Sequence, residues 1–320
     1  MREEKLSHGF QNRSADQSEM RMKNLMRRVC ESSQIGAETL SEATARGCKY
    51  VFSDELGSCL GTYFREKKLV ALNPKCSDAD LASTLVHEAR HAVQKAPLLS
   101  TEKSICSLLT GWRAAEADAM AFECAAVYEM RNTYPEAWFN FKYSHKNVAL
   151  AYSRTEKEPS EGKTPLGEAF KAWFDDASYV ARYDREALNF LEDNMHRAGW
   201  SFLRDDVSGK NIALNLCRSG SSPYLPDTDF LDSKRALTVG EDIALRCRRV
   251  ADDALLTYGR KDLSLTRLFV RSYDGSVRPA VRDDTPAHVV SREKNRQELN
   301  DALREALPPW AMFKKGTKGR

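Results

Sequence analysis

His87, Glu88 and His91 lie within five consecutive residues of the chain. Residues four apart on an α-helix lie one above the other, so His87 and His91 can reach the same metal ion. Glu88 is rotated by about 100° from His87, because a helix has about 3.6 residues per turn. This is the spacing of the H-E-x-x-H motif, in which two imidazoles bind zinc and the glutamate is a general base. The alternative is a chance match, to which every short motif is exposed.

The residues before and after the motif predict a strand and a helix around it. Residues 61–73 are typical of a β-hairpin, since two apolar runs flank a polar turn. Ser77 or Asp78 caps the next helix at its N-terminus. That helix is predicted to run to about Lys95 and to be ended by Pro97.

The second strand of this hairpin is a candidate for binding an extended peptide. It comprises Leu69, Val70, Ala71 and Leu72. An exposed sheet edge binds a peptide by adding it as a further strand. A purely structural edge strand is the alternative interpretation.

A catalytic zinc site needs a third protein ligand, and the residues after His91 limit which one is possible. A metzincin would have glycine at position 94 and histidine at position 97, where this chain has Gln94 and Pro97. Glu116 is the candidate instead, near the start of a helix predicted over residues 112–132. Its alanine neighbours would let two helices approach closely, and a carboxylate buried there needs a partner. The alternative is an ordinary acid stabilised by the helix dipole.

Two further acids on the same predicted helix are alternatives to Glu116. Asp118 lies about 200° around the helix from Glu116, so both cannot face one ion unless the turn is distorted. Glu123 follows Glu116 by two turns and shares its face. Asp118 and Glu123 are therefore alternative ligands or hydrogen-bond partners of a ligating histidine.

Composition indicates a soluble globular protein. The 320 residues are 42% hydrophobic and 30% charged, which allows one large domain or two ordinary ones. The net charge of +3 does not indicate nucleic-acid binding. No apolar run is long enough to span a membrane, so no membrane association is expected.

The cysteines and the first residues suggest the compartment. Eight cysteines are spread singly along the chain, which favours free thiols over disulfides. No apolar segment typical of a signal peptide follows the polar first residues. We therefore expect a cytoplasmic protein, with an effector exported without a cleaved signal as the alternative.

A resemblance to a known family rests on three stretches within about residues 60–130: Leu72-Asn73-Pro74, His87-Glu88-x-x-His91-Ala-x-Gln94 and Ala115-Glu116-Ala-Asp118-Ala119. They resemble a group of uncharacterised bacterial metallopeptidase domains. They are also similar to cytosolic gluzincins that process repressors, whose H-E-x-x-H is followed by a helix of the type E-x-E-A-N-x-F-A. The resemblance places Glu116 at the third ligand and Phe122 at the aromatic position. Four residues after the third ligand, these proteins often have asparagine or aspartate. This chain has Met120 at that position, which removes one polar partner for a histidine.

The predicted fold class is α+β, mainly α, with a minimal zincin-like core and a helical C-terminal extension. The core is a small sheet, the motif helix and the Glu116 helix. Five parts are expected: an N-terminal helical or flexible arm (1–44), the zincin-like metallopeptidase core (45–155), a linker (156–165), a helical region (166–310) and a basic tail (311–320).

The predicted function is a metallopeptidase with one Zn²⁺, acting on a protein or peptide. His87, His91 and Glu116 would bind the ion, and Glu88 would move a proton from water to the leaving amine. The donor to the carbonyl oxygen is left open among three candidates: Tyr128, Tyr143 and His145. The alternative is a non-catalytic regulatory or interaction protein that keeps the zincin scaffold.

Overall fold

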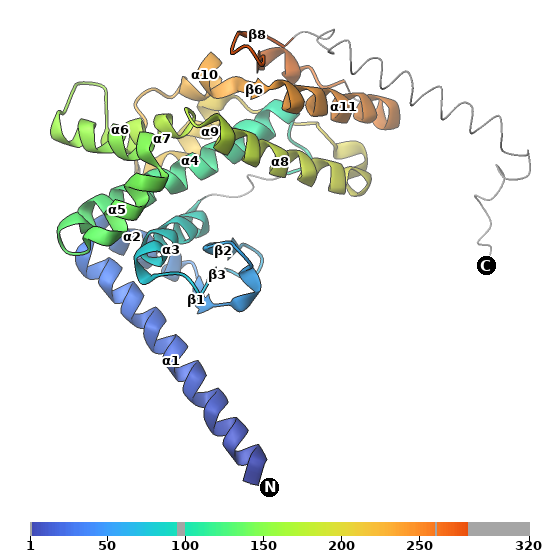
Figure 1. Cartoon of the computed structure of the whole chain (residues 1–320). Coiled ribbons are helices and arrows are strands. Elements are labelled where there is room, and N and C mark those ends of the chain that lie inside the picture. The colour runs from blue at the N-terminus through green and yellow to red at the C-terminus, as the bar shows by residue number, and fades with distance from the viewer. Residues whose placement is uncertain (1, 95–99, 260, 281–320) are drawn as a thin grey trace, which may run out of the picture.

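The computed structural model describes residues 2–94, 100–259 and 261–280. These residues form a mainly helical protein with three small sheets, shown in Figure 1. The predicted α+β, mainly α class is thereby confirmed. The predicted basic tail (311–320) and the last part of the predicted helical region (281–310) lie outside the described residues.

Two helices and three strands precede the motif helix: α1 (Arg2–Ser32), α2 (Gln34–Ala45), β1 (Lys49–Phe52), β2 (Gly61–Phe64), β3 (Leu69–Leu72) and α3 (Asp78–Val93). The second half of α1 packs on α2, α3 and β1 and buries Met22, Leu25 and Val29. The first turns of α1 extend away from the rest of the molecule in Figure 1.

The first sheet has the strand order β1-β3-β2. β2 and β3 form the predicted antiparallel hairpin, and β1 pairs with β3 in parallel. The prediction that Leu69, Val70, Ala71 and Leu72 form an edge strand open to a substrate is wrong. These four residues are β3, whose two sides are already hydrogen-bonded to β1 and β2. An added strand needs unpaired backbone groups, which an edge strand such as β2 provides.

Helix α3 begins as the sequence predicts. The Ser77 side chain accepts a hydrogen bond from the backbone N–H of Asp80, and two aspartates occupy the first turn. The helix ends at Val93, earlier than predicted, because Gln94 has an extended backbone (φ −65°, ψ 137°). The predicted stop at Pro97 lies outside the described residues.

Five helices follow: α4 (Ile105–Glu129), α5 (Pro135–Ser144), α6 (Lys146–Lys157), α7 (Pro165–Trp173) and α8 (Ala177–Ala198). α4 starts at Ile105 and not at the predicted Trp112. The Ser104 side chain caps it by accepting from the Ser107 N–H, and both hydroxyls donate to the Asp206 carboxylate. A partner about a hundred residues later therefore extends the start of this helix.

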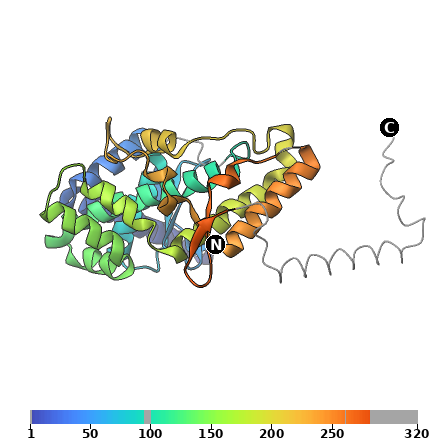
Figure 2. The ribbon, with the colours of Figure 1, turned by 90° about the horizontal axis from the view of Figure 1, so that it is seen from above.

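The remaining elements are α9 (Gly209–Leu216), β4 (Arg218–Ser219), β5 (Ser222–Pro223), α10 (Lys234–Leu237), β6 (Thr238–Gly240), α11 (Glu241–Tyr258), β7 (Phe269–Arg271) and β8 (Val277–Pro279). β4 and β5 form a short hairpin, and β6, β7 and β8 form the third sheet. Figure 2 shows α11 alongside α8, and the two helices are in contact.

Two hydrophobic clusters form the interior, and α4 contributes to both. Its first turns join the second cluster, with α8, α11 and the third sheet. Its later turns join the first cluster, with α1, α3 and α7. Ala169, Phe170 and Trp173 of α7 thus pack in the same cluster as the motif helix, although they follow the predicted linker. The predicted division into domains stays a prediction.

Among the described helices, none combines the length and apolar character needed to cross a bilayer. The prediction of free thiols is confirmed, since all eight cysteines are unpaired with one another.

Candidate metal centre

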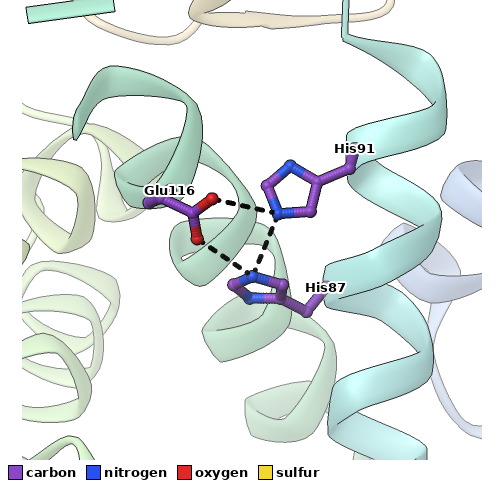
Figure 3. A group of neighbouring side chains, drawn as sticks. All are labelled: His87, His91 and Glu116. Carbon is purple, nitrogen blue, oxygen red and sulfur yellow. Dashed lines mark hydrogen bonds and ion pairs between the residues drawn. The ribbon is translucent and has the colours of Figure 1, made fainter. Parts of the chain in front are cut away.

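The two motif histidines point from α3 toward Glu116 on α4, as Figure 3 shows. The His87 Nε2 and His91 Nε2 atoms are 3.2 Å apart. Glu116 places Oε2 3.5 Å from His87 Nε2 and Oε1 3.5 Å from His91 Nε2. The structure therefore brings together two imidazole nitrogens and one carboxylate from two packed helices.

These separations fit a single metal ion. Ligand atoms at about 2.0–2.1 Å from a tetrahedral centre are about 3.3 Å from one another. The three ligand groups are separated by 3.2 Å and 3.5 Å, close to this distance between tetrahedral ligands. Ala114, Ala115 and Ala117 are buried beside Glu116, so small side chains let α4 approach α3. The three groups could therefore hold one ion between α3 and α4.

Glu123 binds the outer nitrogen of His87. Its Oε2 lies 2.9 Å from His87 Nδ1, so Nδ1 carries a hydrogen and the lone pair of the neutral imidazole is on Nε2. Burial opposes the charged imidazole, but the adjacent Glu116 and Glu123 carboxylates outweigh it and raise the pKa of His87 well above its usual value. Glu123 therefore lies behind His87, outside the group of three ligands.

Asp118 points away from the three ligand groups and is fully buried. Arg90 donates to both of its oxygens, from Nε at 2.7 Å and from a terminal nitrogen at 2.9 Å. Gln94, which the sequence analysis did not identify as a site residue, donates to Asp118 at 2.8 Å and lies 2.9 Å from His91 Nδ1. The structure thus places Asp118 behind His91, with Gln94 between them.

Glu88 faces a cleft of about 280 Å³ between the β2 region and α8. Burial raises the pKa of Glu88, while the two motif histidines and the backbone of Tyr63 act in the opposite direction. β2 approaches α3 closely here, because a Cβ atom on Gly61 would lie 3.1 Å from Glu88 Cγ and 2.7 Å from Thr84 Cγ2. Glycine at this position permits the contact.

Helix α8 supplies the opposite wall of the cleft with Tyr179, Arg182 and Tyr183. Burial, together with the nearby Glu116 carboxylate, raises the pKa of the Tyr183 phenol. Desolvation opposes ionisation of Glu116, but His91, His87 and Tyr183 outweigh it and lower its pKa. Sequence analysis predicted helix in this region but did not place its side chains at the metal centre, because nothing local in the sequence indicates which distant helix α8 packs against.

The three candidate donors to the carbonyl oxygen lie in different environments. Tyr128 packs against Trp138 and Tyr152 in the interior. Tyr143 is 85% exposed on α5. His145 alone of the three lines the cleft, and burial lowers its pKa. Tyr183 joins it there as a second donor.

Met120 also lines the cleft, at the position where the resembling proteins often have a polar residue. The histidines obtain their polar partners elsewhere: Glu123 contacts His87 and Gln94 contacts His91. The departure at Met120 therefore leaves neither imidazole unsupported.

Two histidines and one glutamate on packed helices, with a second glutamate facing a cleft, form a candidate metal site of the H-E-x-x-H type. The chain belongs to the family described as "Putative metallopeptidase family (DUF6782)", whose model matches residues 3–225. This match confirms the resemblance to metallopeptidase domains. Comparisons with curated proteins and with solved structures gave no match.

Proposed function

We propose that this protein is a zinc-dependent endopeptidase in which His87, His91 and Glu116 hold the ion. The observation that carries the proposal is the spacing of these three groups, which fits the edges of a tetrahedral site. Family membership supports metal-dependent peptidase chemistry in general.

The donor set favours zinc. Two neutral imidazoles and one carboxylate match the His₂Glu ligand sets of catalytic zinc, which keep a fourth position for water or substrate. When bound, zinc acts as a Lewis acid and lowers the pKa of a water molecule to about 7. A peptide would reach the centre through the cleft, which is lined by His87 and Glu88.

Glu88 is the proposed general base. It lies in the cleft and not among the three ligands, so its carboxylate can face the attacking water. It accepts a proton as the water oxygen bonds the peptide carbon, and gives that proton to the amide nitrogen as the C–N bond breaks. Its raised pKa makes Glu88 a stronger base than an exposed glutamate.

Tyr183 is the proposed donor to the peptide carbonyl oxygen. Its side chain lines the cleft and lies near the Glu116 carboxylate. The raised pKa keeps the phenol protonated, so its hydrogen can be redirected to a developing oxyanion. His145 is the second candidate on the same cleft.

The substrate is proposed to bind along β2. This strand is an edge of the first sheet, and Gly61 at its start lines the cleft. A peptide added antiparallel or parallel to β2 would pair with free backbone groups and pass Glu88. Strand pairing uses hydrogen bonds to the peptide backbone and needs no chain terminus, so it is compatible with cleavage within a chain.

The test is peptide cleavage by the zinc-loaded protein and by Glu88→Gln. We expect the variant to keep its zinc and to lose at least about 10³-fold in rate, since it retains shape but cannot accept the proton. Glu66→Gln, at an exposed glutamate of the β2–β3 turn, is the matched control and should cleave at the wild-type rate. Zinc binding without any cleavage by the wild-type protein would instead favour a non-catalytic role for the scaffold.

A further inference from the structure

The side-chain amide of Gln94 has its hydrogen-bonding groups engaged in one orientation. Its Nε2 donates to the Ala115 carbonyl and to Asp118 Oδ2, each at 2.8 Å. Both N–H groups are thereby directed to α4, which leaves Oε1 for His91 Nδ1 at 2.9 Å. A carbonyl oxygen only accepts, so Nδ1 of His91 carries a hydrogen and the lone pair of the neutral imidazole is on Nε2, the nitrogen nearest to Glu116 and His87.

Asp118 determines this orientation of Gln94. Its Oδ1 accepts from Arg90 at 2.9 Å and from the Tyr224 hydroxyl at 2.6 Å. Its Oδ2 accepts from Arg90 Nε at 2.7 Å and from Gln94 at 2.8 Å. A flipped Gln94 amide would bring its oxygen against this carboxylate and the Ala115 carbonyl, which is electrostatically unfavourable.

Two of these contacts come from a distant part of the chain. Tyr224 follows the β4–β5 hairpin and is separated from Asp118 by 106 residues. Arg90 also donates to the Arg218 carbonyl, in the same hairpin, at 2.7 Å. The Tyr224 ring packs edge-on against Phe122, over which the Arg90 guanidinium lies. The hairpin and Tyr224 are thus anchored behind the α3–α4 contact.

We propose that Gln94 and Tyr224 are positioning residues for His91. Tyr224 and Arg90 hold Asp118, Asp118 holds the Gln94 amide, and Gln94 sets the imidazole form and ring orientation of His91. The inference rests on the proposed metal-binding role of His91. It makes zinc affinity depend on a residue well outside the H-E-x-x-H motif.

The test measures zinc affinity of the full chain by competition with a chromophoric chelator. Gln94→Met keeps the length of the side chain but removes its donors and acceptor, and should weaken zinc binding about 10–100-fold. Tyr224→Phe removes one of the hydrogen bonds to Asp118 and should weaken binding about 3–10-fold. The control is Tyr152→Phe, which removes a hydroxyl from another buried tyrosine, on α6, and should bind zinc as the wild type does.

The visible spectrum of the Co²⁺-loaded chain provides a readout that a general loss of stability would not move. Gln94→Met should shift the ligand-field bands, whereas Tyr152→Phe should not. Wild-type affinity and spectrum in folded Gln94→Met, or wild-type affinity in Tyr224→Phe, overturns the proposal. If Gln94→Met does not fold, Tyr224→Phe alone decides it. Zinc binding without peptide cleavage would contradict the proposed peptidase and leave these affinities decisive for the positioning role.

Discussion

The two histidines of the centre are held by partners of different charge. His87 contacts the Glu123 carboxylate, whereas His91 contacts the neutral amide of Gln94. A carboxylate stabilises an imidazolium more than an amide does. His87 is accordingly the histidine whose pKa is raised well above the usual value.

Zinc binding should therefore release a proton near neutral pH. Because its pKa is raised, the His87 imidazole of the metal-free protein keeps its proton to a higher pH than an ordinary histidine, and a ligating imidazole must be neutral. We expect apparent zinc affinity to fall as pH decreases, because protons compete with the ion for the His87 imidazole. Calorimetry in buffers of different ionisation enthalpy measures the number of protons released on zinc binding. Zinc binding at pH 7 without proton release would contradict the assignment of His87.

At the residue scale, helical spacing predicted that His87 and His91 share one face, whereas Glu116 was predicted from its alanine neighbours and from the family resemblance. Spacing left Glu123 open between ligand and partner, because two residues on one face can lie at different depths. Gln94 was not predictable, because its role depends on the turn that ends α3. Tyr183 was not predictable either, because α8 reaches the cleft only through tertiary packing.

At the scale of elements, local sequence patterns predicted the β2–β3 hairpin but not the pairing of β1 with it. β1 pairs in parallel with β3, a non-local contact that turns the expected edge strand into a central one. The start of α4 likewise depends on Asp206, which binds the capping serines from far along the chain. In both cases a distant partner decided what the local sequence left open.

The close contact of β2 with α3 predicts a strong effect of Gly61→Ala. The added Cβ would lie 2.7 Å from Thr84 Cγ2 and 2.9 Å from Leu72 Cδ2, so strand or helix must shift. We expect a loss of about 1–3 kcal/mol in the free energy of unfolding, measured with urea. Ser58→Ala, at an exposed position before β2, should change stability by less than about 0.5 kcal/mol. Equal stability of both variants would show that β2 has room to move.

At the scale of the whole molecule, α4 connects the two hydrophobic clusters and is tied to α8 by a buried ion pair. Arg113 donates to both oxygens of Asp184 at 2.6 Å and to the Ala236 carbonyl at 2.6 Å. Both side chains are 1% exposed. Asp184 is adjacent to Tyr183, so the same pair helps to place α8 beside the metal centre.

Asp184→Asn should destabilise the whole fold. It leaves the Arg113 guanidinium buried without a charged partner, which costs about 3–5 kcal/mol. Asp175→Asn is the matched control, because it removes a half-exposed pair with Arg235 and should cost about 0–1 kcal/mol. Urea unfolding compares the two, and a small, equal loss in both would contradict a structural role for the buried pair.

The central claim is that His87, His91 and Glu116 bind one zinc ion. X-ray absorption at the zinc edge of the loaded protein tests it most directly. The predicted spectrum shows two imidazoles among nitrogen and oxygen ligands at about 2.0–2.1 Å and no sulfur. A sulfur ligand at about 2.3 Å, or fewer than two imidazoles, would contradict the site.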